Sequence, residues 1–267
     1  MHRLLLPGIV VLAFLLRVVA VNSFPVGFTP DEASQGYDAY SLLKTGRDQW
    51  GESWPLAFRS FGDYKLPLYT YLTIPFVAVF GLNEFSVRLP NAIFGTLAVL
   101  ATYLFTRKLF KDPKVSIVAS LLLAVSPWHI PLSRGAFEAN LTTFFLPLGV
   151  WAFLKGIEKP SWMAVASLAF GLNLFSYHSA RLVAPFLLLR LVLWKRKDLY
   201  SSYILLRRSI SRYSWAIVVL LLFLGIAGYT MLTGAGSRGA DLAIFNPTDH
   251  WAGVADRRYE VVLQGFP

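Results

Sequence analysis

The chain has 267 residues, of which 55% are hydrophobic and 15% are charged, and its formal net charge is +10. Soluble domains carry about a quarter charged residues, so a composition this apolar excludes an ordinary soluble fold and indicates a membrane protein. The positive charge would suggest nucleic acid in a soluble chain, but we expect no nucleic-acid partner here. The sequence contains no Cys, which excludes disulfides and thiol chemistry, and its four His show no metal-ligand spacing.

Seven apolar runs approach or reach the roughly 20 residues that span a bilayer. They predict an all-α membrane protein with spans at about 4–22, 88–108, 115–131, 137–155, 161–178, 180–194 and 214–232. The first run contains Arg17 and is followed by no convincing cleavage site, which favours a retained anchor over a signal peptide.

Basic residues cluster in three connections between these runs. About half of the 25 Lys and Arg residues lie in 107–114, 155–159 and 194–212, whereas the alternate connections are far less basic. The positive-inside rule then predicts that the basic connections and the N-terminus are cytoplasmic. Residues from about 23 to 87 form a long first external loop, within a spanning module that covers 1–232.

The external loop is predicted to hold two juxtamembrane helices. One is amphipathic, runs from about Pro30 to Lys44 and is closed by Gly46. The other is the apolar run 66–82, which we expect to lie at the surface or to be partly re-entrant, because a further span would reverse the side of every basic connection. The polar stretch 233–267 is expected to be external and to begin a longer C-terminal region.

The motif Thr29-Pro30-Asp31-Glu32 predicts the start of the first of these helices. A hydroxyl cap, a proline at the first helical position and acids facing the positive end of the dipole all favour it. On a purely structural interpretation, Glu32 reaches back to the cap amide. On a functional interpretation, the same helix start exposes Asp31 as a catalytic residue.

Charged groups at the outer membrane boundary cost free energy, so they are expected to be paired or to have a function. Besides Asp31 and Glu32 they are Lys65, Arg134, Glu138 and Arg181, with Arg17 nearby. Cations can hold the phosphate of a lipid-linked donor, and a carboxylate can take the proton of an attacking hydroxyl.

Each of these residues also has a structural interpretation. Lys65 can be a snorkelling lysine, and Arg134 with Glu138 can be an exposed ion pair. Arg181 and Arg17 can anchor their helices to lipid headgroups. We expect three further acids to be solvated loop residues, namely Asp38, Asp48 and Asp63.

The order of five segments along the chain carries more information than any one of them. TPDE, GRDQWG, GDYKLPLYTYL, FGLNEFSVRLPNAIFG and SPWHIPLSRGAFEANLTTFF follow one another over about residues 1–195. In this order they resemble the integral-membrane glycosyltransferases of the GT-C fold. The likeness is to family 39, which holds the protein O-mannosyltransferases and the lipid A aminoarabinose transferases.

The resemblance implies roles for individual residues. Asp31 matches the catalytic acid of the first external loop, with Glu32 as its partner. Lys65 matches a lysine that touches the donor phosphate, although K-L-P-L replaces K-P-P-L. Glu138 takes the position of a later acid, which is Asp in the aminoarabinose branch. Arg134 and Arg181 are nominated as phosphate ligands on charge and sidedness alone.

The resemblance further implies an inverting enzyme with a GT-C-type helical bundle. It would transfer a sugar from a polyprenyl-phosphate-linked donor to a protein or lipid acceptor, at the outer face of a prokaryotic plasma membrane. No metal is assigned, although a divalent cation near paired acids stays an alternative. A transporter or flippase for lipid-linked sugars, or a non-catalytic membrane subunit, is the alternative function.

Overall fold

The computed structural model describes residues 2–60, 63–205 and 210–232. Its elements are, in chain order, α1 (His2–Val18), α2 (Pro30–Thr45), β1 (Phe58–Ser60), β2 (Asp63–Lys65), α3 (Leu68–Phe80), α4 (Glu84–Phe110), α5 (Pro113–Ala124), α6 (His129–Arg134), the 3₁₀ helix η1 (Glu138–Asn140), α7 (Leu141–Glu158), α8 (Ser161–Asn173), α9 (Ala180–Trp194), α10 (Arg196–Leu205) and α11 (Ile210–Leu232). The expected polar stretch 233–267 lies outside the described residues.

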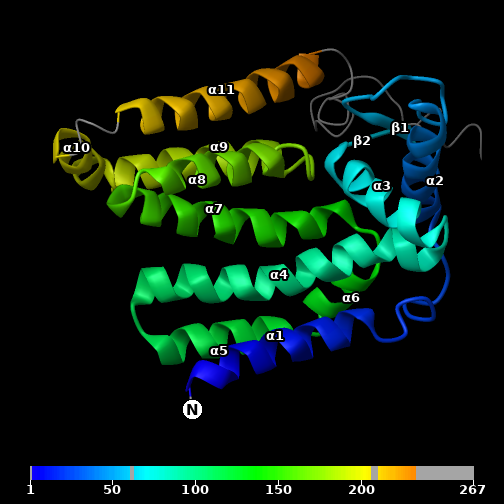
Figure 1. Ribbon diagram of the computed structural model, residues 1–267, viewed down its shortest axis with the longest axis horizontal. Coiled ribbons are helices and arrows are strands. Elements are labelled where there is room, and N and C mark those ends of the chain that lie inside the picture. The colour runs from blue at the N-terminus through cyan, green and yellow to red at the C-terminus, as the bar shows by residue number, and fades with distance from the viewer. Residues whose placement is uncertain (1, 61–62, 206–209, 233–267) are drawn as a thin grey trace, which may run out of the picture.

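The long helices form a bundle in which they run side by side (Figure 1). Helix α7 packs between α4 and α8, α11 packs on α8, and α1 and α5 pack on α4. Within the described residues, three helices are long and apolar enough to cross a membrane: Glu84–Phe110, Glu138–Glu158 and Ser214–Leu232. Each of the seven predicted runs contains a helix, so the predicted all-α membrane fold is confirmed.

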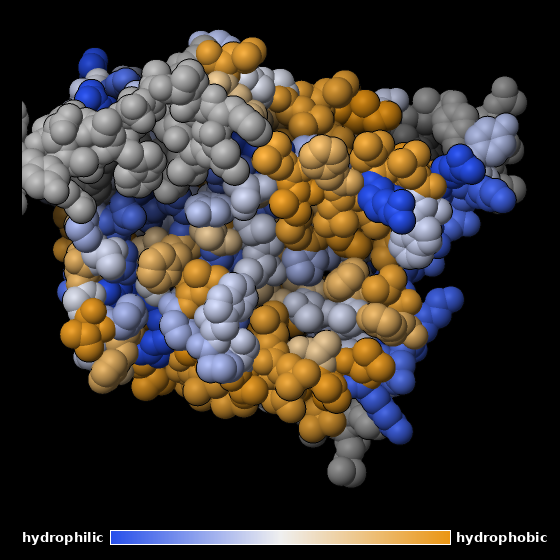
Figure 2. Space-filling model, turned by 180° about the vertical axis from the view of Figure 1, so that it is seen from behind, coloured by the Kyte–Doolittle hydropathy of each residue, from blue (hydrophilic) through white to orange (hydrophobic). Residues whose placement is uncertain are grey.

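The surface of the bundle is apolar, as lipid contact requires. Figure 2 shows a broad hydrophobic area over the helices, with hydrophilic residues gathered at the end that lies on its right. Inside, small residues such as Ala152 of α7 and Ala166 of α8 are buried beside Phe153 and Phe170. Small side chains let helix backbones approach closely, which matters because lipid removes most of the hydrophobic drive for helix association.

Helix α2 begins and ends where the sequence predicts. The Thr29 side chain accepts a hydrogen bond from the Glu32 amide, the Glu32 carboxylate accepts one from the Thr29 amide, and Pro30 opens the helix. Gly46 closes it with a φ of 70°, a left-handed conformation that glycine adopts readily. In Figure 1, α2 stands across the ends of the bundle helices instead of along them.

The rest of the external loop differs in part from the expectation. The run 66–82 forms α3, a helix of 13 residues, which at 1.5 Å per residue is about 20 Å long. That is shorter than the roughly 30 Å hydrocarbon core and supports the juxtamembrane interpretation. An antiparallel hairpin, in which Phe58 pairs with Lys65, precedes it. The sequence did not predict this hairpin, because strands of three residues are too short to show an alternating pattern.

Two further expectations about the spans need correction. The predicted span 115–131 is broken, because α5 ends at Ala124 and the separate short helix α6 starts at His129. The predicted basic connection 194–212 contains helix α10.

Three charged residues are buried where the sequence suggested contact with water or headgroups. Arg17 is fully buried and donates to the carbonyls of Ala124 and Leu123 and to His129 Nδ1, so its interpretation as a headgroup anchor is wrong. Asp38 and Asp48 are buried as well and are not solvated loop acids. The Asp63 side chain lies outside the described part of the structure.

Candidate active site

Glu32 is the anchor of the N-terminus of α2. Its side chain is 1% exposed, and Oε1 accepts from Arg88 Nε at 2.8 Å and from the Ala136 amide at 2.9 Å. Oε2 accepts from Arg88 Nη2 at 3.1 Å and from the Thr29 amide at 2.9 Å. One carboxylate thereby joins α2 to α4 and to the turn between α6 and η1.

The electrostatics of Glu32 agree with a structural role. Burial alone would raise its pKa, but the hydrogen bonds from Arg88, Thr29 and Ala136 and the charge of Arg88 outweigh burial and lower the pKa. The group therefore stays ionised at neutral pH, with its lone pairs occupied by donors. We assign Glu32 to holding the site in place, whereas the sequence had placed it among the catalytic acids.

Arg88 is a site residue that the sequence analysis did not nominate. It is fully buried, and besides Glu32 it donates to the carbonyls of Val21, Pro25 and Gly27. The signal was present in the quoted FSVRLPN segment, because a charge inside an apolar span demands a partner. What the sequence alone did not indicate is that this partner is Glu32.

Asn91, one turn after Arg88 in α4, also bonds distant backbone groups. Its side-chain amide donates to the carbonyls of Leu132, Gly135 and Phe137, and its Oδ1 accepts from Asn140 Nδ2 at 2.7 Å. Residues three apart share a helix face, so this face of α4 fixes both α2 and the segment that precedes α7.

Asp31, next to this anchor, has a contrasting environment. Its side chain is 68% exposed, and Oδ1 lies 2.8 Å from Lys65 Nζ. Lys65 is only 8% exposed in its side chain and also donates to the Asp31 carbonyl at 3.1 Å. The end of the hairpin therefore places the nearly buried ammonium of Lys65 in contact with the accessible carboxylate of Asp31.

Glu138, the first residue of η1, contacts α2 close to Asp31. Its Oε2 accepts a hydrogen bond from Gln35 Nε2, and Gln35 follows Asp31 by one turn of α2. Gln35 is a second residue that the sequence analysis missed, and nothing in the sequence distinguished it from the other polar residues of the loop.

A cavity of about 370 Å³ brings these side chains together. Its lining includes Asp31, Gln35, Ser60, Lys65, Leu132, Ala136, Phe137, Glu138, Ala139 and Tyr177. Two carboxylates, one ammonium and one amide share its wall with apolar and aromatic groups. Such a set can take a proton from a nucleophile, hold an anionic group and contact a sugar.

The two arginines that the sequence nominated do not line this cavity. Arg134 donates to the carbonyls of Leu16, Val19, Ala20 and Phe24, and so satisfies the C-terminal end of α1. Arg181 is buried and donates to the Leu174 carbonyl and to Thr230 Oγ1. Both side chains therefore bind protein groups in this structure.

A buried acid lies behind the cavity wall. Asp38 accepts from the amide and the side chain of Gln49, both at 3.1 Å, and Gln49 also donates to Ser34, which contacts the cavity residue Ser60. Burial raises the pKa of Asp38 to about 6, with a further increase from the charge of Asp48 that the bonds from Gln49 partly offset. Among the described residues, no three His, Asp or Glu side chains gather as a metal site would require.

Comparison with known proteins identifies the class. Residues 65–229 match the family described as dolichyl-phosphate-mannose-protein mannosyltransferase, and the chain belongs to this family. The match begins at Lys65 and includes Arg88 and Glu138.

Two relatives are described as undecaprenyl phosphate-alpha-4-amino-4-deoxy-L-arabinose arabinosyl transferases. The one from Pseudomonas aeruginosa (strain LESB58) is 28% identical over 63% of this chain and 31% of its own length. The one from Pseudomonas fluorescens (strain Pf0-1) is 27% identical over 73% of this chain and 35% of its own length. The chain thus spans about a third of the length of these relatives.

The fold agrees with a solved structure. The oligosaccharyltransferase of Archaeoglobus fulgidus, crystallised with a tethered acceptor peptide, superposes with a TM-score of 0.60 over 93% of this chain and 35% of its own, at 17% identity. The GT-C-type bundle implied by the sequence is confirmed. The family match and the names of these relatives also favour a transferase over the transporter alternative.

Proposed function

We propose that this chain carries the catalytic part of a glycosyltransferase that moves a sugar from a polyprenyl-phosphate-linked donor to a protein or lipid acceptor. The observation that carries the proposal is the meeting of Asp31, Lys65 and Glu138 in one cavity of a chain that belongs to this family. The proposed module covers residues 1–232, with the external loop 23–87 forming much of the site.

Asp31 is proposed as the general base. It is the accessible carboxylate of the site, so it can approach the hydroxyl or amine of an acceptor and take its proton as the nucleophile attacks the anomeric carbon. The bond from that carbon to the phosphate oxygen breaks, and the polyprenyl phosphate leaves as a stable anion. No general acid is then required.

Lys65 is proposed to bind the donor phosphate. A point charge stabilises the dianion that develops on the leaving group more than it stabilises the ground-state diester. In an inverting displacement the nucleophile and the leaving group lie on opposite sides of the anomeric carbon. The contact of 2.8 Å between Asp31 and Lys65 is therefore assigned to the resting site, and we expect the donor sugar to separate the two groups.

Glu138 is proposed to contact a hydroxyl of the sugar or of the acceptor from the facing wall. Gln35 donates a hydrogen bond to one of its carboxylate oxygens and so holds the group in the cavity wall, which suits a residue that orients a ligand. Arg134 and Arg181 are given no direct part in this mechanism, because neither lines the cavity and each donates hydrogen bonds to protein groups.

The site is proposed to face outward in the plasma membrane of a prokaryote, with the N-terminus inside. The opposite end of the bundle supports this orientation, because Arg107, Lys108, Lys111 and Lys195 surround one cavity there. In Figure 1 that end, marked by α10, lies across the bundle from α2 and the hairpin. Basic residues collect on the cytoplasmic side.

The proposal is tested by Asp31→Asn. The amide keeps the shape of the side chain but cannot act as a base, so transfer should fall by roughly two to four orders of magnitude. The assay follows a radiolabelled undecaprenyl-phosphate mannose or aminoarabinose donor in membranes containing the protein. It measures release of polyprenyl phosphate together with label in protein and in lipid fractions, which separates a glycoprotein product from a glycolipid product. Turnover close to that of the unsubstituted protein would remove Asp31 from the mechanism.

A further inference from the structure

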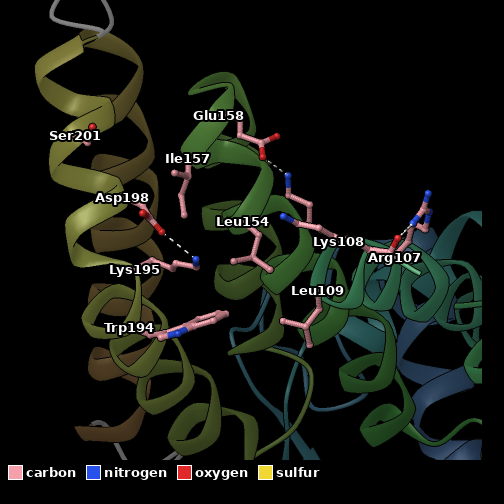
Figure 3. A pocket seen from close by; sticks show the side chains of 11 residues that line it. Arg107, Lys108, Leu109, Leu154, Ile157, Glu158, Trp194, Lys195, Asp198 and Ser201 are labelled. Atoms are coloured by element: carbon pink, nitrogen blue, oxygen red, sulfur yellow. Dashed lines mark hydrogen bonds and ion pairs between the residues drawn. The ribbon is translucent and has the colours of Figure 1, made fainter. Parts of the chain in front are cut away.

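A second and larger cavity lies at the end of the bundle opposite the candidate active site (Figure 3). It measures about 920 Å³ and is lined by Arg107, Lys108, Leu109, Lys111, Leu154, Ile157, Glu158, Trp194, Lys195, Asp198 and Ser201. These residues come from the ends of α4, α7 and α9 and from α10. The proposed transfer reaction makes no use of it.

The charges around this cavity are unbalanced. Four cations face two carboxylates, which gives the lining a net charge of +2. Each carboxylate is already engaged: Glu158 lies 2.6 Å from Lys108, and Asp198 lies 2.9 Å from Lys195. Figure 3 shows the two ion pairs on different walls, the first between α7 and α4 and the second between Lys195, which follows α9, and α10.

Arg107 and Lys111 hold the surplus charge. Neither has a carboxylate partner among the ion pairs of the described residues. Arg107 donates to the Lys111 carbonyl through one nitrogen, which leaves its other donors for a ligand. Cations without a carboxylate partner in a cavity wall are favourable for a phosphate group.

Apart from Ser201, the rest of the lining is apolar. Leu109, Leu154, Ile157 and Trp194 lie among the charged groups, and Figure 3 shows the Trp194 ring pointing from α9 into the cavity. Leu109 and Trp194 are exposed. A site for a soluble anion gains nothing from this surface, whereas a lipid brings glycerol and acyl groups that can cover it.

We propose that this cavity binds the phosphate headgroup of an anionic membrane lipid. Its position supports the assignment, since α4 and α7 are long and apolar enough to cross the membrane, and the cavity lies where they end. Basic pockets between spanning helices are suited to such headgroups. The inference is independent of the proposed transferase activity.

The test is native mass spectrometry of the detergent-solubilised protein, titrated with phosphatidylglycerol or with phosphatidylcholine of the same chains. The unsubstituted protein should bind phosphatidylglycerol more tightly. The double variant Arg107→Gln and Lys111→Gln should weaken that binding roughly thirtyfold, at about 1 kcal/mol for each basic residue and tenfold for each 1.4 kcal/mol.

A matched control removes the same charge nearby. Lys114 and Lys159 are exposed at this end but do not line the cavity, so Lys114→Gln with Lys159→Gln should keep the affinity within about twofold. Arg107→Lys with Lys111→Arg should retain most of the binding, and circular dichroism should show that every variant is folded.

Three results would overturn the proposal. The first is equal weakening in the cavity variant and in the control variant, which would reduce the effect to general surface charge. The second is unchanged binding in the cavity variant. The third is displacement of phosphatidylglycerol by glycerol phosphate at equal concentration, which would identify a site for a soluble phosphate instead of a lipid.

Discussion

The contact between Glu32 and Arg88 provides a direct test of how the site is held together. Replacing Glu32 with Gln keeps nearly the same volume but removes the negative charge that faces Arg88. The guanidinium is fully buried, and it would lose its one buried anionic partner and keep neutral carbonyl oxygens and the half-exposed Glu84, 3.8 Å away. The amide would also have to place an N–H group where the carboxylate accepts hydrogen bonds.

The expected loss of stability is large. Removing one partner of a buried ion pair destabilises a protein by about 3–5 kcal/mol, because the other charge stays buried without compensation. For chains near this size, about 2–4 °C of Tm corresponds to each kcal/mol. Glu32→Gln should therefore lower the Tm of the detergent-solubilised protein by roughly 6–20 °C, measured by intrinsic fluorescence.

A matched control is present at the same arginine. Glu84 Oε2 lies 3.8 Å from Arg88 Nη1, but its side chain is 42% exposed. Exposed pairs contribute about 1 kcal/mol or less, so Glu84→Gln should leave the Tm nearly unchanged. A Glu32→Gln protein that keeps its Tm but loses transfer would refute the structural assignment and return Glu32 to the chemistry.

Three further predictions concern charge, pH and sidedness. Lys65→Met should lower kcat/KM about ten- to hundredfold, because charge-assisted contacts contribute about 1.5–3 kcal/mol. Lys65→Arg should recover part of the lost kcat/KM. An effect on the KM of the acceptor alone would contradict phosphate binding. Since the pKa of Asp38 is raised to about 6, its contribution to stability is fully present below its unfolded pKa of about 3.9 and is lost as pH rises through 6. The Tm of the unsubstituted protein should therefore contain a decrease between pH 4 and 7 that Asp38→Asn removes. A Tm–pH profile that is the same in both proteins would refute this role of Asp38. A cysteine at the exposed Ser53 should react with an impermeant thiol reagent on intact cells, whereas one at Lys159 should not; the reverse pattern would invert the orientation.

The helices and the start of α2 could be predicted from the sequence because their causes are local. An apolar run of sufficient length is helical in a bilayer, since backbone groups must be paired within the segment. The capping box needs only Thr29 and Glu32, three residues apart. The gathering of Asp31, Lys65 and Glu138 was anticipated from sidedness and from the family resemblance, and the structure brings them to one cavity.

The partners of the buried charges could not be predicted, because they depend on contacts between distant parts of the chain. Glu32 and Arg88 are 56 positions apart, and Arg17 and His129 are 112 apart. Asp38 was expected to be solvated because it lies in the external loop, yet it is buried and bonded to Gln49, a residue 11 positions away. In each case, no local pattern in the sequence identified the contacts that the buried group makes.

The two adjacent acids of α2 have different roles because of helix geometry. Successive residues of an α-helix point about 100° apart, so Glu32 cannot bond Arg88 unless Asp31 faces another direction. Asp31 and Gln35 are one turn apart and share a face, which is the face that lines the cavity. The rigid set of donors around Glu32 therefore fixes the rotation of α2 about its own axis, and this rotation aims Asp31 at Lys65. The base of the proposed reaction is oriented by the buried neighbour that the chemistry does not use.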